Sequence, residues 1–338
     1  MTTYRPTTLQ KILHHFTQGE RLGVTQLAQL TGLSRAILHR YIKALLDQGD
    51  LEKVGEGPQA KYCLKNTSKI LQTKDKSERS ALPYQATQLL NDTFLKYTPQ
   101  GTVLQGHSGL IRWCEARWLD PVQKAESYLR IAKHINSLRN SCGVLDATNG
   151  FKKNMNNSSL DHIYYADQYK RMDFGRGKLA EMTFYAKQSQ NRKGLLASIA
   201  LFLDQLRCLI QHEKVDALAF VPATITRQWQ LLHMLDEALQ DVNLPRITIK
   251  KFYEGSMKIP QKSLKKREER IANAQHTIYI RDAQAGTYQK VLLIDDFVGS
   301  GATLNETAKK LKKEGVKKVI GFAIVGNMDM SYDIINEM

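Results

Sequence analysis

Two adjacent carboxylates followed by a loop of small residues form the strongest chemical signal in the sequence. Asp295 and Asp296 follow four apolar residues, 291–294, and the small-residue segment 299–303 leads into a helical pattern. Such a loop lets several backbone N–H groups point inward at a helix N-terminus, which suits a phosphate. Paired carboxylates accept hydrogen bonds from a sugar diol and can steady a magnesium ion. Together these groups predict a binding site for ribose 5-phosphate.

The whole run 291–304 resembles the signature of the phosphoribosyltransferase family, which binds 5-phosphoribosyl 1-diphosphate (PRPP) with Mg²⁺. Ser300 stands where many members have threonine. The resemblance implies that Asp295 and Asp296 are the catalytic carboxylates and hold the ribose 2- and 3-hydroxyls. Their role toward the metal is then indirect, because the magnesium ion is bound to the ribose. It implies that the 5-phosphate is bound by Gly299, Ser300, Gly301, Ala302 and Thr303. The alternative is a different Rossmann-like loop with an acidic strand end.

A second segment is similar to the Gln-x-x-Leu-…-Arg-…-Asn segment of ComF-type phosphoribosyltransferases. Residues 261–273 carry this pattern, and 221–224 match the Val-Pro step that follows the first sheet strand in those proteins. Ten basic and four acidic residues between 250 and 290 fit a mobile loop that closes over a diphosphate. For any single lysine, the alternative is a solvated helix face. The resemblance implies that the diphosphate is contacted by Arg227, Lys262, Lys265, Lys266, Arg267 and Arg270.

The elements that must position these residues alternate between helix and strand over residues 158–338. Strand patterns recur at 217–221, 247–252, 277–280, 291–294 and 319–325, and helical patterns at 195–210, 228–239 and 303–312. This order predicts an α/β domain of the phosphoribosyltransferase type with a mostly parallel sheet. Ligands of such sheets bind at the carboxyl ends of the strands.

Residues 1–65 show the order of a winged helix-turn-helix DNA-binding domain. Helical patterns begin at Thr7 or Thr8, at Thr25 and at Ser34, and two strand-like runs follow at 51–54 and 61–64. We expect Leu27, Ala28 and Leu30 to face inward from the second helix. The third is the expected recognition helix, and its polar side carries the predicted DNA contacts Ser34, Arg35, His39, Arg40 and Lys43. The alternative is a winged helix used for protein contacts.

Two further regions lie between these domains. Residues 66–83 are polar and charged, which predicts a linker, and residues 84–157 predict a helical middle region, clearest at 121–139. We find no chemical motif in this helical region.

Composition narrows the class of protein. The 338 residues carry 49 Lys and Arg against 33 Asp and Glu, a formal charge of +16, which favours a polyanionic partner. A hydrophobic share of 42% argues against global disorder. No apolar run reaches the length of a membrane span, so no membrane partner is expected. Four scattered cysteines without a C-x-x-C pair predict neither a disulfide framework nor a zinc cluster, and favour the cytoplasm.

Two functions follow from this architecture. The first is a DNA-binding enzyme acting on PRPP or nucleotides, whose layout is similar to effectors of retron-type phage-defence systems. Its partners would then include an RNA–DNA hybrid molecule and a reverse transcriptase, and homo-oligomers are possible. The second is a PRPP-sensing transcription regulator whose phosphoribosyltransferase fold is not catalytic. The dense basic run and the helical middle region favour the first.

Overall fold

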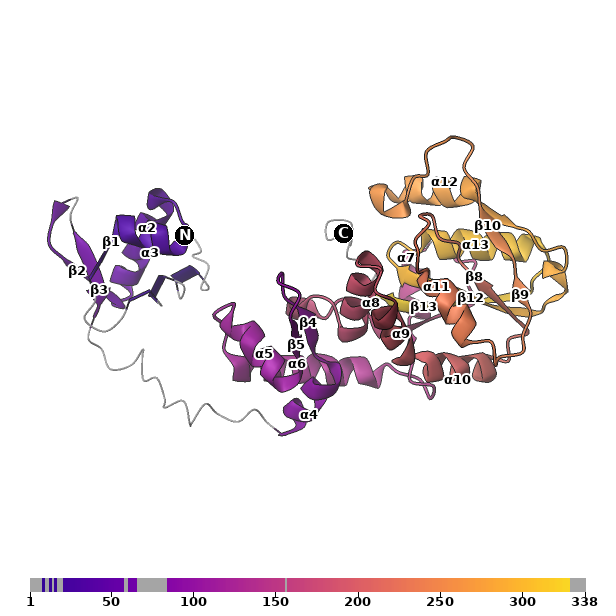
Figure 1. The fold of residues 1–338 in the computed structure, drawn as a ribbon, viewed down its shortest axis with the longest axis horizontal. Helices are drawn as coiled ribbons and strands as arrows, with labels where there is room; N and C mark the ends of the chain where they lie inside the picture. The colour runs from indigo at the N-terminus through magenta and orange to yellow at the C-terminus, as the bar shows by residue number, and fades with distance from the viewer. Residues whose placement is uncertain are drawn as a thin grey trace. The chain divides into compact units, whose positions relative to one another are not determined.

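The computed structural model describes residues 8–9, 12–13, 15–16, 21–57, 60–65, 84–155 and 157–328 (Figure 1). The chain forms two compact units, one of residues 1–91 and 104–127 and the other of residues 92–103 and 128–338. The segment predicted as a linker, residues 66–83, lies outside the described residues.

A winged helix-turn-helix forms near the N-terminus. Helices α2 (Val24–Thr31) and α3 (Arg35–Asp47) precede strands β2 (Leu51–Val54) and β3 (Lys61–Leu64), and β1 (Leu22–Gly23) completes the sheet. The strands are antiparallel in the order β1-β3-β2. This matches the fold predicted for residues 1–65, and β2 and β3 have their predicted bounds.

Local signals account for the turn between α2 and α3. Gly32 ends α2 with a φ of 69°, a left-handed conformation that glycine adopts at little steric cost. Leu27 is fully buried, but Leu30, expected inward, is 51% exposed. The reason is that the buried stripe of α2 runs through Val24, Leu27 and Ala28, and position 30 falls at its edge. Helix α2 also begins at Val24 rather than at Thr25.

The middle of the chain contains four helices among its described residues. They are α4 (Tyr84–Thr93), α5 (Gly106–Glu115), α6 (Pro121–Ser137) and α7 (Thr148–Asn154). Three short strands were not predicted: β4 (Leu95–Tyr97), β5 (Val103–Gln105) and β6 (Leu145–Asp146). The first two form a small sheet, whereas β6 joins the main sheet of the C-terminal half. Runs of two or three residues are too short to show a strand period in the sequence.

A six-stranded sheet organises the C-terminal half. Its order is β6-β7-β13-β12-β8-β9, and every pairing is parallel except that of β6 with β7. The parallel strands are β7 (His162–Gln168), β8 (Ala217–Phe220), β9 (Arg246–Ile247), β12 (Lys290–Val298) and β13 (Lys318–Gly326). Residues 291–294 of β12 and 319–325 of β13 are continuous apolar runs, as expected where helices cover both faces of a sheet.

Each face of the sheet has its own core. Leu292 and Ile294 pack with α8 (Lys178–Gln188), α9 (Arg192–Ala200), α10 (Leu203–Glu213) and α11 (Leu231–Ala238). Val291 and Leu293 point to the other face, where they pack with α7 and α13 (Ala302–Lys313). Successive strand residues alternate between the faces, so one apolar strand serves both layers.

Two predicted elements are divided in the structure. The helix predicted at 195–210 is the pair α9 and α10, bent by 48°. Within the described residues no single helix is long and apolar enough to cross a membrane, and this bent pair meets that test only when taken together. The strand predicted at 247–252 becomes β9 and β10 (Ile249–Lys251), and β10 pairs with β11 (Ile278–Ile280) instead of the main sheet. Helix α12 (Arg267–Thr277) connects β10 to β11.

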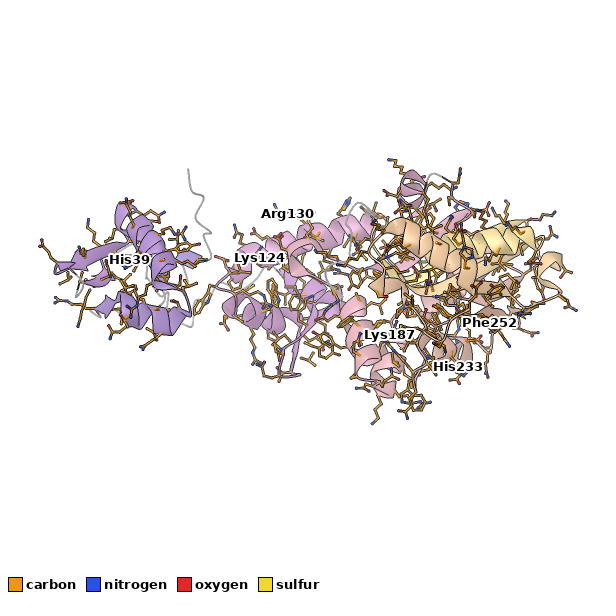
Figure 2. All side chains as sticks on the ribbon, turned by 90° about the horizontal axis from the view of Figure 1, so that it is seen from above. His39, Lys124, Arg130, Lys187, His233 and Phe252 are labelled. Carbon is orange, nitrogen blue, oxygen red and sulfur yellow. A yellow bond between two sulfur atoms is a disulfide. The ribbon has the colours of Figure 1, made fainter. Side chains whose placement is uncertain are left out.

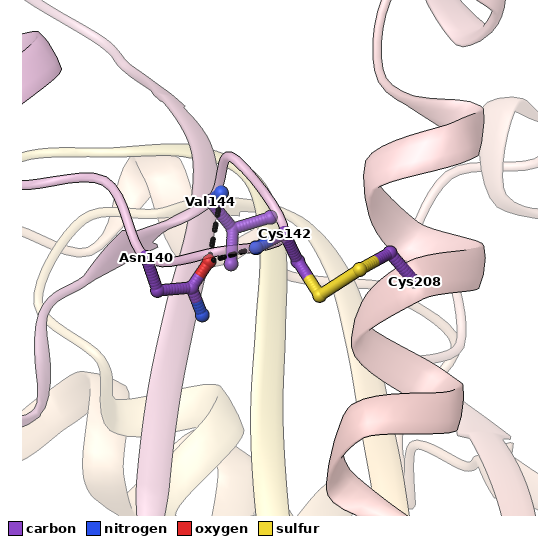
Figure 3. Close-up of a disulfide and its surroundings, with 4 residues drawn as sticks. All are labelled: Asn140, Cys142, Val144 and Cys208. Carbon is purple, nitrogen blue, oxygen red and sulfur yellow. Dashed lines mark hydrogen bonds between the residues drawn. A yellow bond between two sulfur atoms is a disulfide. The ribbon is translucent and has the colours of Figure 1, made fainter.

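A disulfide joins Cys142 to Cys208 (Figure 3). Their Cα atoms lie 5.4 Å apart, although 66 residues separate them in the sequence. The side-chain oxygen of Asn140 shapes the turn by accepting the N–H groups of Cys142 and Val144, at 3.0 and 3.2 Å. The prediction that the cysteines form no disulfide is therefore wrong for this pair. Packing of α10 against the turn brings the two thiols together, and no local pattern shows that contact.

Candidate functional site

The two carboxylates lie at the carboxyl end of a central strand. Strand β12 pairs in parallel with β8 on one side and β13 on the other. The chain leaves β8 towards β9 through α11, and leaves β12 towards β13 in the opposite direction through α13. The ends of β8 and β12 therefore flank a point where the strand order reverses, which is where open α/β sheets bind ligands. Asp295 and Asp296 lie at this point.

The loop between β12 and α13 presents backbone N–H groups to the same point. Gly301 is the N-cap of the twelve-residue helix α13 and has a φ of 76°. The Ser300 hydroxyl accepts the N–H of Ala302 at 3.5 Å. A Cβ on Gly299 would lie 3.2 Å from the Phe297 ring, so glycine keeps the loop close to the strand end. These features give the loop the backbone of an anion-binding helix N-terminus.

Two lysines balance the charge of the carboxylate pair. The ammonium of Lys187, on α8, forms an ion pair with Asp296. Burial and the neighbouring Asp296 raise the pKa of Asp295 to about 7, against the opposing effects of the Asp296 N–H, Lys187 and Lys251. Burial lowers the pKa of Lys251, whose ammonium donates to the Thr224 hydroxyl at 2.8 Å. The site therefore holds carboxylates and ammonium groups in nearly equal number.

A cavity of about 650 Å³ contains these groups. Its polar lining includes both carboxylates, the whole loop 299–303, and the side chains of Lys187, Lys251, Thr224, Arg227, Gln261 and Arg270. This volume exceeds what a phosphate alone would need and falls within the range of small-molecule sites.

The same cavity has an aromatic wall. Five Phe, Tyr and Trp residues line it: Tyr169, Phe184, Phe220, Trp229 and Phe297. The Arg176 guanidinium lies 3.8 Å from the centre of the Phe184 ring, and its Nε donates to the Tyr169 hydroxyl at 3.0 Å. Arg192 lies 5.2 Å from the centre of the Trp229 ring. An aromatic wall of this kind is a suitable surface for packing against a planar group.

The predicted Gln-Leu-Arg-Asn pattern folds into a set of mutual contacts. Gln261 Nε2 donates to the Arg270 carbonyl and to Asn273 Oδ1, both at 3.0 Å. Arg270 Nε in turn donates to the Leu264 carbonyl at 2.9 Å. A Cβ built on Gly299 would lie 3.8 Å from Arg270 Nη1, which shows that the guanidinium stands over the small-residue loop. The pattern therefore positions Arg270 beside the carboxyl end of β12.

The structure separates the six basic residues predicted to contact a diphosphate. Arg227 and Arg270 line the cavity. Lys265 and Lys266 are exposed and do not line it, and the side chain of Lys262 lies outside the described part of the chain. Arg267 turns away to the Asn154 carbonyl and the Met155 sulfur. Burial against α7, which the sequence does not show, directs Arg267 to this structural position.

Two lysines that line the cavity, Lys187 and Lys251, were not predicted as site residues from the sequence. Lys187 lies 109 positions before Asp296 and Lys251 lies 44 positions before Asp295, and neither lysine belongs to a motif. The one sequence feature that pointed to either lysine was the excess of basic over acidic residues between 250 and 290, a segment that includes Lys251. Nothing local singles out Lys187 among the lysines of the chain.

The donor set fits a magnesium ion that arrives with its phosphate ligand. The described residues contain no group of three or more His, Cys, Asp or Glu that could hold a metal. Asp295 and Asp296 supply two neighbouring carboxylates, which is the usual protein share when Mg²⁺ keeps waters and binds substrate phosphates. A resident all-protein metal site is a poorer match to this pair.

The exposed face of α3 carries the predicted DNA contacts. Arg35, His39, Arg40 and Lys43 are all exposed, and His39 is labelled in Figure 2. Ser34 has a different local role, because its hydroxyl accepts the N–H of Ile37 at 3.4 Å and caps α3. The cap aligns the start of the recognition helix.

Comparison with known proteins agrees with both halves of this description. Residues 230–333 match the model of the phosphoribosyl transferase domain, and residues 10–55 match the IclR helix-turn-helix domain. No curated protein matches the chain. The matched ranges contain the β12 carboxylates with their loop and the two helices of the DNA-reading motif. The chain thus carries a phosphoribosyltransferase domain fused to an N-terminal IclR-type winged helix.

Proposed function

We propose that the C-terminal unit binds PRPP through the end of β12. Asp295 and Asp296 accept hydrogen bonds from the ribose 2- and 3-hydroxyls, and the N–H groups of 299–303 bind the 5-phosphate. Arg227 and Arg270 bind the diphosphate. The juxtaposition of carboxylates, anion loop and cationic side chains in one cavity is the observation that carries this proposal.

We further propose that the domain transfers the phosphoribosyl group to an acceptor. The aromatic wall supports an enzyme over a sensor, because PRPP has no planar group to place against it. In the reaction the bond between ribose C1 and the diphosphate oxygen breaks, and its electron pair leaves with the diphosphate. An acceptor nitrogen then bonds to C1 and loses its proton. Bound Mg²⁺ would screen the diphosphate charge, while the carboxylates hold the ribose ring as positive charge develops on it.

Calorimetric titration of PRPP with Mg²⁺ tests the ligand. The wild type should bind. The double variant Asp295→Asn/Asp296→Asn should bind about tenfold more weakly or worse, because each substitution replaces a charged hydrogen-bond acceptor by a neutral amide. Glu254→Gln, an exposed acid outside the cavity, is the matched control. Equal binding by wild type and double variant, or by neither, would remove the proposed site.

Product analysis separates enzyme from sensor. The protein is incubated with Mg²⁺, PRPP and a pool of bases and nucleotides, with and without DNA, and the products are followed by chromatography. Consumption of PRPP with formation of a new nucleotide supports the enzyme. Intact PRPP and nucleotides together with a PRPP-dependent change in DNA affinity would establish the PRPP-sensing regulator instead.

The N-terminal domain is proposed to bind DNA chiefly through phosphates. Replacing Arg35, Arg40 and Lys43 by alanine should weaken binding and flatten its salt dependence, because each phosphate contact releases condensed counterions. The control removes three exposed lysines of the C-terminal unit, Lys309, Lys313 and Lys317. An unchanged salt slope in the first variant would favour a role in protein contacts.

The fused architecture is also the basis for proposing a cytoplasmic effector role in a retron-type phage-defence system. An RNA–DNA hybrid molecule and a reverse transcriptase would then be its partners. Gene neighbourhood tests this: adjacent reverse transcriptase and structured RNA genes support it, and adjacent purine or competence genes contradict it.

A further inference from the structure

We propose that Lys187 binds the diphosphate end of the ligand and thereby sets the preference for PRPP over ribose 5-phosphate. The proposal rests on the proposed binding of PRPP at the end of β12. Lys187 belongs to α8, outside the range 230–333 that matches the phosphoribosyl transferase model, and is labelled in Figure 2. Its position follows from contacts to β12 and to the loop after β8.

The side chain of Lys187 reaches the carboxylate pair from the α8 face of the sheet. Its ammonium contacts Asp296 Oδ2, and both side chains keep about one quarter of their surface exposed, 27% and 26%. An ammonium has three N–H donors, and Asp296 is its one hydrogen-bond acceptor among the described residues. Two donors therefore remain for a ligand in the cavity that Lys187 lines.

The backbone of Lys187 is tied to the loop after β8. Arg227 Nη1 donates to the Lys187 carbonyl at 3.3 Å, and the N–H of Trp229 donates to Gln190 Oε1 at 2.9 Å. These two contacts fix the end of α8 against residues 227–229. The Lys187 ammonium and the Arg227 guanidinium thus belong to one connected wall of the cavity.

The helices on the two faces of the sheet indicate which end of the ligand lies beside this wall of the cavity, namely the diphosphate. The 5-phosphate loop leads into α13, which packs on the face of Val291 and Leu293. Helices α8 and α11 pack on the opposite face, with Leu292 and Ile294. A ribose held by both carboxylates, with its 5-phosphate at α13, directs its C1 substituent towards α8 and the loop after β8. The Lys187 ammonium lies in this part of the cavity, with two N–H donors available for the ligand.

Two ligands that differ only in the diphosphate test the assignment. Full-length wild type and Lys187→Met are titrated with PRPP and with ribose 5-phosphate, each with Mg²⁺. We expect Lys187→Met to weaken PRPP binding about tenfold or more, the loss of a charge-assisted hydrogen bond, and to change ribose 5-phosphate binding less than about threefold. Lys187→Arg should stay within about threefold of wild type for PRPP. Lys193→Met, an exposed lysine on α9 outside the cavity, is the charge-matched control.

Other outcomes overturn the proposal. An equal loss for both ligands would mean that Lys187 only positions Asp296, and unchanged PRPP binding would mean that it does not reach the diphosphate. These results leave the site at the end of β12 intact, because the wild type still binds. Failure of the wild type to bind either ligand would instead overturn the proposed function together with this role.

Discussion

At the residue scale, the carboxylate pair works because neighbouring strand residues point to opposite faces. Asp296 continues the face of Ile294 and forms an ion pair with Lys187 of α8, while Asp295 feels the charge of both Lys187 and Lys251 of β10. Two lysines from different elements therefore act on the carboxylate pair. This offsets the repulsion between adjacent carboxylates and keeps both at the strand end.

The raised pKa of Asp295 gives the C-terminal unit a specific pH dependence. In the unfolded chain an aspartate has a pKa near 3.9. A carboxyl group whose folded-state pKa is about 7 contributes most to stability at low pH, and loses that contribution as the pH rises towards 7.

We therefore expect Asp295→Asn to gain stability relative to wild type as the pH rises from 5 to 8. The measurement is urea unfolding of both full-length proteins across this range, followed by tryptophan fluorescence. Asp282→Asn, which lies outside the cavity, should show no such trend. A constant difference between wild type and Asp295→Asn would contradict the raised pKa.

At the element scale, the segment β10–α12–β11 serves to place one arginine. Gln261 holds the backbone of Arg270, and the Leu264 carbonyl holds its side chain. The many other basic residues of this segment include exposed lysines and Arg267, which packs on α7. Charge density alone is therefore a poor guide to which cation reaches the ligand.

Gln261→Ala should lower PRPP affinity by about three- to tenfold. Arg270→Ala should lower it by about tenfold or more. The double variant should lose little beyond Arg270→Ala, because Gln261 acts through Arg270. Lys265→Ala, exposed and outside the cavity, should bind as wild type does. Titration calorimetry of the four variants measures the coupling, and additive losses would contradict it.

At the scale of the whole molecule, the winged helix and the phosphoribosyltransferase domain belong to different compact units of one chain, and the disulfide lies in the second unit. Cys142 and Cys208 connect the turn before β6 to α10, which packs in the core beneath α8 and α9. A bridge that closes a loop of 66 residues restricts the unfolded chain strongly.

The double variant Cys142→Ser/Cys208→Ser should lower the free energy of unfolding by about 2–4 kcal/mol. Urea unfolding of the full-length chain measures this, and reduced wild type should show a similar loss. Reductant should have no further effect on the double variant, and DNA affinity should not change, since the winged helix contains neither cysteine. Identical unfolding of oxidised and reduced wild type would contradict the stabilising role.

Local sequence determined the parts of this protein whose signals lie within about fifteen residues. The strand-loop-helix run 291–304, the helix-turn-helix with Gly32 and Ser34, and the strands β8, β12 and β13 follow from short-range periodicity, caps and turns, whereas the central strand β7 was not predicted. These patterns sufficed for the fold class and for the carboxylates and loop at the end of β12.

Tertiary structure decided which distant residues meet at those elements. The pairing of Lys187 with Asp296, the bond between Cys142 and Cys208, and the turn of Arg267 towards α7 all join positions at least 66 apart. Such contacts depend on how helices pack on the two faces of the sheet, and a lysine that will reach a carboxylate has the same local sequence signal as one that stays in solvent. Residues of the same chemical type therefore differ in their contacts only because of where packing places them, and those positions are established only in the folded chain.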